Sequence, residues 1–422
     1  MRGLLIGSAL ASLLGVGCSN EAGALDAAMA LRSFPIGDCD QDGVEDYATA
    51  LLYGDYSDPH LSDFLSIHSG KSGQVVASCD LGRSRHTAEF LWAGAGLEQL
   101  GLLVRYEAVT EPMLKLVRMG RGGASEFLAE LHRTGSDGRV VGIGVRAAPD
   151  VTGGVLVVIC SAIAPDPASV ECVLYRWSQG KSLELQRFNF RSPNPNGYLE
   201  CAVGQFEGGA ALDLAVAEPV PGKRDASPGP IYLIDGNSGE QRALAVGKLR
   251  DEYVGRRLAA LRSSSEGTYD LLVIDSEDNA EPMRPRDGLH AFSPGHSSQA
   301  LWELDGASGH FELTWDLQVL PDLDGDGTED MGFVNSLEDS VEIVSGRTGT
   351  LMRRISHSPW QMIDCVTHCA DADADGRPDL LLSVRPGRDA DMAPDPADSQ
   401  FFGCIVVSSA DGRTLRRYPA HR

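Results

Sequence analysis

The amino-acid sequence predicts an all-β protein, folded over residues 26–422 as a seven-bladed β-propeller of four-stranded antiparallel blades. The first observation is an aspartate-rich loop that recurs along the 422-residue chain at intervals of 49 to 60 residues. The second is an apolar run with a glycine turn, which follows each loop by roughly 30 residues. The third is that no helical period persists over a useful length after residue 34. Repeated strand units of this length are typical of propellers, in which each blade buries its faces against its neighbours.

The clearest loop lies in the segment 321–334, PDLDGDGTEDMGFV. Aspartates occupy its positions one, three, five and nine, and a glycine that permits a sharp bend occupies position six. The same spacing occurs in DCDQDGVED from residue 38 and in DADADGRPD from residue 371. An apolar run follows each loop, and Met331, Phe333 and Val334 therefore predict a buried strand. The aspartates of the three loops are Asp38, Asp40, Asp42 and Asp46; Asp322, Asp324, Asp326 and Asp330; and Asp371, Asp373, Asp375 and Asp379.

Alternate acidic residues around a tight turn direct their oxygens toward one point, where they repel one another unless a cation lies between them. Hard oxygen ligands at this density favour calcium, so we expect one Ca²⁺ in each loop, about three in all. One such loop could equally be a solvated turn, but three loops with one spacing argue against that alternative. An EF-hand is excluded, because position twelve is Thr49, Phe333 or Leu382 where an EF-hand needs glutamate.

Weaker copies of the loop lie between these three. One begins at Gln205 and another at Arg262, and looser copies begin near residues 93 and 148. Each unit then consists of strand A, the loop, strand B, a longer loop, strand C, a glycine turn and strand D. Units two to five depart from the aspartate pattern, and only Gln205, Glu207 and Asp213 are left open as a weak metal site. Closure of the ring should rest on packing of the last unit against the first.

The unit GQFEGGAALDLAVAEP from Gly204 resembles the FG-GAP repeat. The aspartate loops resemble those of integrin α-subunit propellers and of bacterial VCBS-type repeat proteins, and the resemblance covers nearly all of residues 26–422. It implies that each loop binds calcium through the side chains at positions one, three, five and nine and through the backbone carbonyl at position seven. Position seven is Val44, Thr328 and Arg377 in the three loops.

Composition and the N-terminal segment indicate an exported, acidic protein. The formal net charge of −24 argues against nucleic acid as a partner, because phosphates would be repelled. Residues 4–16 form an apolar run of signal-peptide length that is too short to span a bilayer. Residues 1–24 are therefore expected to be a signal, cleaved either before Cys18, which would carry a lipid, or after Ala24. The expected location is the cell envelope, through that lipid, or the secreted fraction, and we expect a monomer.

Eight cysteines follow Cys18, an even number that suggests disulfides in an exported protein. The expected pairs are Cys39 with Cys79 and Cys160 with Cys172, which should face each other across one hairpin. Cys404 has three candidate partners, and free buried thiols are the alternative. Those candidates are Cys201, Cys365 and Cys369.

The sequence carries no complete catalytic motif. Gly70-Lys71-Ser72 ends like a P-loop but lacks the required first glycine. The leading hypothesis is a calcium-binding module for a protein or glycan partner. The alternatives are a structural module of a surface or matrix, and an enzyme such as a calcium-assisted polysaccharide lyase.

The partner is expected on the face opposite the calcium loops. Successive loops of an antiparallel meander alternate between its two ends, so the long B–C loops lie on that opposite face. Long irregular loops on a rigid scaffold are where binding usually occurs. Three of these loops carry an arginine followed by an aspartate, which either solubilise the loop or grip an anionic group of the partner. The arginines are Arg224, Arg286 and Arg388.

Overall fold

The structure, a computed structural model, contains only β-strands among its described residues. These are residues 28–53, 63–82, 100–107, 112–119, 125–131, 140–149, 155–163, 169–178, 181–191, 200–207, 211–217, 231–244, 253–263, 270–278, 286–294, 299–305, 313–335, 340–356, 361–387 and 401–419. No helix that could cross a membrane occurs among them.

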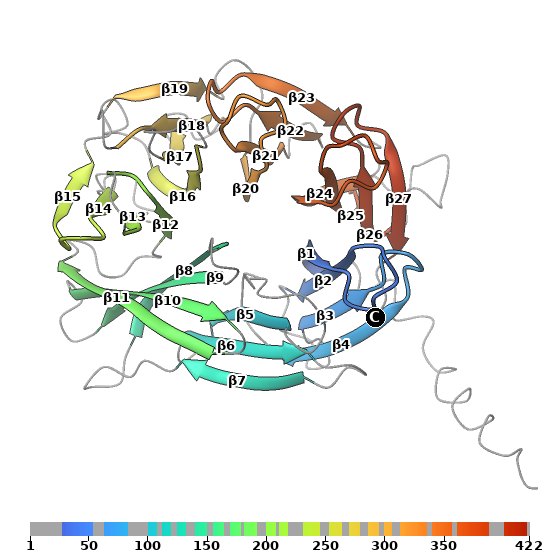
Figure 1. Ribbon diagram of the computed structural model, residues 1–422, viewed down its shortest axis with the longest axis horizontal. Coiled ribbons are helices and arrows are strands. Elements are labelled where there is room, and N and C mark those ends of the chain that lie inside the picture. The colour runs from blue at the N-terminus through green and yellow to red at the C-terminus, as the bar shows by residue number, and fades with distance from the viewer. Residues whose placement is uncertain are drawn as a thin grey trace, which may run out of the picture.

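The strands form seven antiparallel sheets in chain order within the described residues, six with four strands and one with three (Figure 1). The first three sheets are β1 (Ala28–Gly37), β2 (Asp46–Tyr53), β3 (Asp63–His68) and β4 (Val75–Gly82); β5 (Leu100–Glu107), β6 (Pro112–Met119) and β7 (Ser125–Leu131); and β8 (Val140–Pro149), β9 (Val155–Ile163), β10 (Ser169–Ser178) and β11 (Lys181–Arg191).

The last four sheets repeat one meander order, in which each strand pairs with the next along the chain. They are β12 (Glu200–Gly204), β13 (Asp213–Ala217), β14 (Ile231–Ile234) and β15 (Gln241–Leu244); β16 (Tyr253–Leu261), β17 (Leu271–Asp278), β18 (Arg286–Phe292) and β19 (Ala300–Asp305); β20 (Leu313–Leu320), β21 (Asp330–Asn335), β22 (Ser340–Val344) and β23 (Leu351–Ser356); and β24 (Gln361–Cys369), β25 (Asp379–Pro386), β26 (Gly403–Val407) and β27 (Thr414–Pro419).

The sheets stand around a ring, each with its first strand toward the centre (Figure 1). The inner strands of neighbouring sheets contact one another, as β12 does with β8 and β16, and β24 with β20 and β1. This is the arrangement of a β-propeller, in which apolar side chains fill the space between sheets. Phe333 is fully buried, and Met331 and Val334 are no more than 1% exposed, which confirms the predicted buried strand.

The second sheet has three strands within the described residues, β5, β6 and β7. They match the predicted strands B, C and D of that unit. The predicted strand A falls within residues 83–99, which lie outside the described residues. Six of the predicted four-stranded units are therefore present as such, and the count of seven complete blades stays a prediction.

The first and last sheets close the ring, as the sequence predicted. Tyr47 of β2 and Tyr418 of β27 lie with their rings 4.5 Å apart, within an apolar cluster that also contains Leu381 and Cys404. The Tyr418 hydroxyl donates a hydrogen bond to the carbonyl oxygen of Gly70. These contacts join residues more than 300 positions apart, so the ring is closed by side-chain packing rather than by a shared strand.

The cysteines depart from the disulfide predictions. No two of the described cysteine side chains are joined, and the Cys39 thiol donates to the carbonyl oxygen of Ile36 at 3.4 Å, so the Cys39–Cys79 pair is not formed. Cys404 lies in the seam between the first and last sheets, 2.8 Å from the Ser33 hydroxyl. Cys160 and Cys172 lie directly opposite each other in the β9–β10 register, as expected for that hairpin, but Cys172 is not in a disulfide, so the predicted Cys160–Cys172 bond is not formed either.

Candidate metal centres

The three aspartate loops share one backbone conformation. Position six has a positive φ in each, between 86° and 88°, which explains the glycine there. Position four also has a positive φ, at Gly325 in the sixth sheet but at Gln41 and Ala374 in the others. A non-glycine residue with a positive φ has a strained backbone, so contacts made by the rest of the loop must hold it in this conformation.

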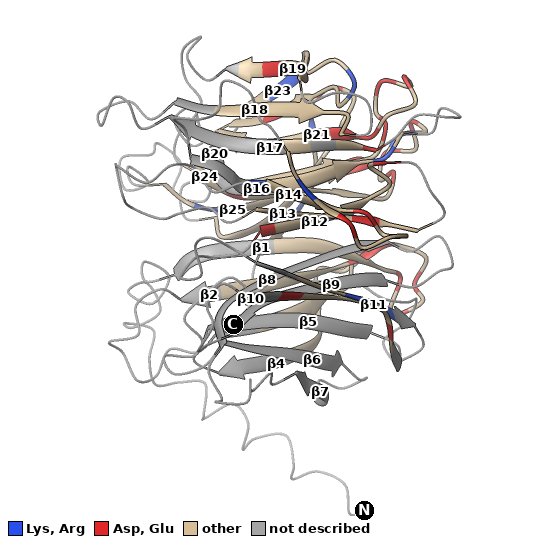
Figure 2. Ribbon diagram, turned by 90° about the vertical axis from the view of Figure 1, so that its left-hand side faces the viewer, with Lys and Arg blue, Asp and Glu red and all other residues tan. Residues whose placement is uncertain are grey.

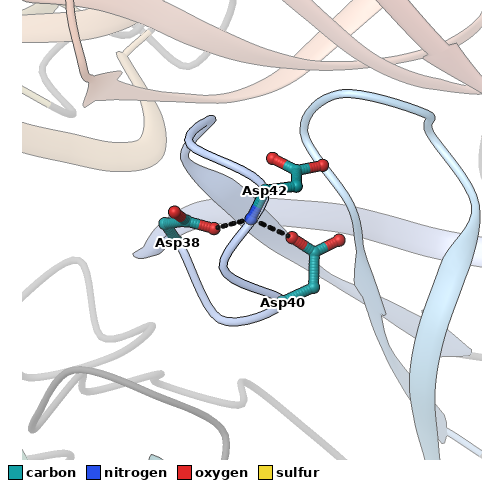
Figure 3. A group of neighbouring side chains, drawn as sticks. All are labelled: Asp38, Asp40 and Asp42. Atoms are coloured by element: carbon teal, nitrogen blue, oxygen red, sulfur yellow. Dashed lines mark hydrogen bonds between the residues drawn. The ribbon is translucent and has the colours of Figure 1, made fainter.

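The loop backbone holds the first, third and fifth aspartates in place. In the first loop the Asp42 N–H donates to Asp38 Oδ1 at 2.9 Å and to Asp40 Oδ1 at 3.1 Å (Figure 3). The N–H groups at positions five and six donate to the first aspartate in all three loops. The residue at position seven, such as Val44, donates its N–H to the fifth-position carboxylate. Each loop thus positions its carboxylates through its own backbone N–H groups.

Three carboxylates of each loop converge on one point. Their nearest oxygens lie within 4.8 Å of one another. The groups are Asp38, Asp40 and Asp42; Asp322, Asp324 and Asp330; and Asp371, Asp373 and Asp379. The structure therefore brings together nine of the twelve predicted side-chain ligands. Asp46, Asp326 and Asp375 lie outside these groups in the structure.

The ninth aspartate is buried and joins its loop to the C–D turn of the same sheet. Asp330 is fully buried, and its Oδ2 accepts the Leu323 N–H at 2.7 Å while its Oδ1 accepts the Gly346 N–H at 3.0 Å. Asp46 makes the same pair of bonds to Cys39 and Gly70. The aspartate loops and the glycine turns consequently lie on one face, as predicted, and acidic residues gather there in Figure 2.

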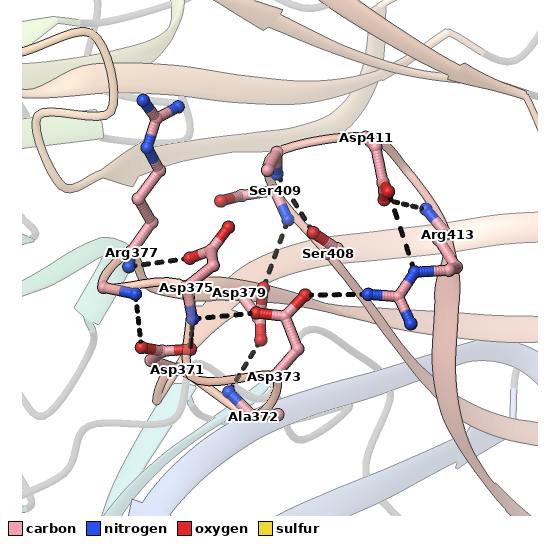
Figure 4. Close-up of polar contacts among 12 residues, drawn as sticks. Asp371, Ala372, Asp373, Asp375, Arg377, Asp379, Ser408, Ser409, Asp411 and Arg413 are labelled. Atoms are coloured by element: carbon pink, nitrogen blue, oxygen red, sulfur yellow. Dashed lines mark hydrogen bonds and ion pairs between the residues drawn. The ribbon is translucent and has the colours of Figure 1, made fainter.

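The residue of the C–D turn that donates its N–H to the ninth aspartate was not predicted from the sequence. A Cβ at Gly70, Gly236 or Gly346 would lie 1.8 to 2.0 Å from a carbonyl oxygen of the facing loop. The seventh sheet has Ser409 at this place, and its N–H reaches Asp379 Oδ1 at the longer distance of 3.2 Å (Figure 4). The recurring glycine after Ser69, Asp235 and Ser345 was the signal that could have revealed this role.

Burial raises the pKa of the ninth-position carboxylates Asp46, Asp330 and Asp379, and that of Asp330 reaches about 6. The backbone N–H donors lower these pKa values, and nearby loop carboxylates raise them further. Asp322 and Asp324 act in this way on Asp330. A cation between the carboxylates would favour their charged forms and lower the pKa again.

The donor set fits a hard divalent cation. Every side-chain ligand is a carboxylate oxygen, and the groups contain no sulfur or nitrogen donor. Calcium accepts six to eight oxygens in flexible geometry, which a loop with water completing the shell can supply. The residues present are therefore compatible with the predicted calcium, with Asp38, Asp322 and Asp371 as the first ligands of each loop.

In the loop of the fourth sheet, the ninth-position aspartate accepts the same kind of backbone hydrogen bonds as in the three aspartate loops. Asp213 accepts the N–H groups of Phe206 and Glu207 at 2.8 Å and that of Gly236 at 2.9 Å. The Glu207 carboxylate forms an ion pair with Arg242. No group of three carboxylates forms around Asp213 among the described residues. Glu207 is engaged by Arg242, and the weak metal site left open at Gln205, Glu207 and Asp213 stays a prediction.

Neighbouring loops are tied to one another by acidic side chains. Glu329 of the sixth sheet accepts the Arg262 N–H of the fifth at 2.8 Å, and its own N–H donates to the Arg262 carbonyl at 3.0 Å. Asp270 of the fifth sheet holds Gln205 of the fourth in the same way. Glu45 of the first sheet accepts the Ala370 N–H of the last. These contacts fix the positions of adjacent loops around the ring.

Comparisons with known proteins support no functional assignment. No family model matches the sequence, and no curated protein matches it, so the FG-GAP resemblance is not confirmed. One similar solved structure is BBS1N in complex with ARL6DN, with 12% identity, a TM-score of 0.45, and coverage of 83% of this chain and 87% of that one. Another is a Penicillium chrysogenum α-L-arabinanase complexed with arabinobiose, with 12% identity, a TM-score of 0.43, and coverage of 75% and 91%. Both are β-propellers, and likeness this low carries neither activity nor partner to this chain.

Proposed function

We propose that this chain is an exported, calcium-binding β-propeller of seven blades and the FG-GAP type, which serves as a binding module for a protein or glycan partner. The observation that carries the proposal is that a cluster of three aspartate carboxylates occurs in each of the first, sixth and seventh sheets, on one face of a closed ring. Backbone N–H donors hold each group in advance of binding, so little ordering entropy opposes the cation.

Calcium would act here as a structural ion. It would neutralise carboxylates that now repel one another and tighten the loop against the buried ninth aspartate. Extracellular sites of this kind bind calcium at roughly 10⁻⁴ to 10⁻³ M. At ten times the dissociation constant each site stabilises the folded state by about 1.4 kcal/mol, and three sites by about 4 kcal/mol.

The experiment is thermal unfolding with saturating calcium and with EGTA. Asp324→Ala and Asp373→Ala should each remove about a third of the calcium-dependent shift in melting temperature. Glu240→Ala is the matched control, because it removes an exposed carboxylate from a C–D turn of the same face and belongs to none of the three groups. A melting temperature that does not respond to calcium would refute the proposal.

The partner surface is proposed on the face opposite the loops, in the long B–C connections. Residues 218–230, 279–285 and 388–400 lie outside the described residues, and with them Arg224 and Arg388. Arg286 begins β18, but its side chain is outside the description. A variant with all three arginines replaced by alanine should lose binding to envelope material at an unchanged melting temperature. Binding equal to that of the parent would eliminate the arginines as the contact.

A further inference from the structure

The seam between the sixth and seventh sheets lacks the acidic tie that joins the other neighbouring loops of the described residues. The seventh sheet has Pro378 at the position where the first and sixth sheets have Glu45 and Glu329. Proline has neither a carboxylate to accept the N–H of the preceding loop nor an N–H to donate to its carbonyl. The sixth and seventh loops are therefore not tied in the way that Glu329 and Glu45 tie their neighbours.

A cavity of about 280 Å³ opens at this seam. Leu323, Ile343 and Met352 of the sixth sheet form an apolar wall, and Arg353 of the same sheet lies beside them. Arg377 and Ser409 line it from the seventh sheet. The cavity is smaller than the pockets that hold drug-sized ligands, and its size suits one residue or a comparably small group.

The polar groups of this cavity have unused hydrogen-bonding capacity. The guanidinium groups of Arg353 and Arg377 form no ion pair within the described part of the chain, whereas the adjacent Arg354 pairs with Glu342 at 2.8 Å. In Figure 4 the Arg377 side chain extends away from the loop carboxylates. The Ser409 hydroxyl oxygen is buried and has no hydrogen-bond partner among the described residues, and the residue as a whole is only 6% exposed.

Ser409 also differs from the residue found at the same position of other C–D turns. The equivalent residue is glycine in the first, fourth and sixth sheets, where a Cβ would collide with the facing carbonyl. The seventh sheet accepts a side chain there and lengthens the bond from the Ser409 N–H to Asp379. A departure from a local rule that leaves a buried hydroxyl unpaired is expected where a ligand completes the hydrogen bonding.

We propose that this seam binds the C-terminal carboxylate of a peptide whose last side chain is apolar. Two guanidinium groups and a hydroxyl supply donors for the carboxylate oxygens, and the apolar wall receives the side chain. No aromatic residue lines the cavity within the described part of the chain, so a sugar ring would find no aromatic face there on which to stack. Asp324 stands at the edge of the cavity, and calcium in the sixth loop would offset its negative charge. This inference rests on the proposed function, because it needs calcium in the sixth loop.

The test uses the whole chain and isothermal titration calorimetry in saturating calcium. The probe is acetyl-Ala-Ala-Gly-Leu with a free carboxylate, compared with the same peptide as its C-terminal amide. The free acid should bind at least about tenfold more tightly, because the amide loses the charge-assisted bonds. Arg377→Ala and Arg353→Ala should each weaken binding by about tenfold or more, and Ser409→Ala by several-fold. Arg417→Ala, an exposed arginine of the same sheet outside the cavity, is the matched control and should bind normally.

The possible contrary results separate the two proposals. The seam site would be overturned by equal affinity for acid and amide or by no measurable binding of the acid. It would also be overturned if Arg377→Ala left the affinity unchanged. Arginine-dependent binding of trigalacturonate without binding of the peptide would overturn the peptide assignment in favour of an anionic glycan. Arg377 is exposed, so its substitution tests the site even if Arg353→Ala fails to fold. Calcium stoichiometry is measured on the same samples, and a normal value with no peptide binding leaves the calcium function standing.

Discussion

Replacement of Gly236 by alanine should destabilise the protein more than replacement of Gly239 in the same turn. The two glycines follow β14 and are three residues apart, but the structure requires them for different reasons. A Cβ at Gly236 would lie 2.0 Å from the carbonyl oxygen of Leu212. A Cβ at Gly239 would meet no atom within 4 Å, and only its φ of 72° disfavours a side chain.

The expected magnitudes follow from these contacts. Alanine at position 236 must move the turn by about an ångström, which breaks the bond of 2.9 Å from its N–H to the buried Asp213 carboxylate. A hydrogen bond to a charged group contributes about 1.5–3 kcal/mol, and the carbonyl overlap adds to that loss. Alanine at position 239 should cost about 1–2 kcal/mol, the strain of a left-handed conformation. The fourth sheet is not among the three sheets with a predicted calcium loop, and unfolding in EGTA keeps calcium out of the comparison.

Urea-induced unfolding of the two variants and the parent gives the comparison directly. Thermal unfolding is less sensitive, because for about 400 residues unfolding together 1 kcal/mol shifts the melting temperature by only about 1 °C. We expect Gly236→Ala to lose about 3 kcal/mol or more and Gly239→Ala about 1–2 kcal/mol. Equal losses would show that close approach to the loop is not what selects glycine at position 236.

Three further predictions concern other parts of the ring. Calcium binding at the sixth loop should weaken as the pH falls through about 6, because burial raises the pKa of Asp330 and its proton must leave before calcium binds; calcium titrations at several pH values measure this. Tyr418→Phe should cost about 1–2 kcal/mol in urea unfolding, since it removes the buried donor to Gly70 that helps to close the ring, and an unchanged stability would contradict that role. Cys39 should be alkylated without reductant once the protein is unfolded, and mass spectrometry that finds it in a disulfide would contradict the thiol described here.

Much of the fold was predictable because the repeat carries local rules. The loop spacing placed strand boundaries correctly: β21 begins at Asp330 and β25 at Asp379, each at the ninth position of its loop. The apolar residues of β21 are buried as their pattern indicated. The shared face of loops and turns followed from meander geometry alone.

The rest depended on contacts between distant residues. The hydrogen bonds that the Arg262 and Ala370 N–H groups donate to Glu329 and Glu45 join different sheets, and no local pattern indicates them. The Cys39 pairing failed because an even cysteine count says nothing of distance, and Cys39 is buried within its own loop. The ninth aspartate was assigned only as a ligand, although Asp46 lies outside its carboxylate group and serves the backbone instead.

The central claim is that the three aspartate groups are three cation sites. The most direct measurement is the number of calcium ions bound per chain at equilibrium dialysis, in the parent and in variants that remove one ligand from each loop. The account predicts three ions for the parent, two for Asp40→Ala, Asp324→Ala or Asp373→Ala alone, and none for the triple variant. A parent that binds no calcium, or a triple variant that binds as much as the parent, would contradict it.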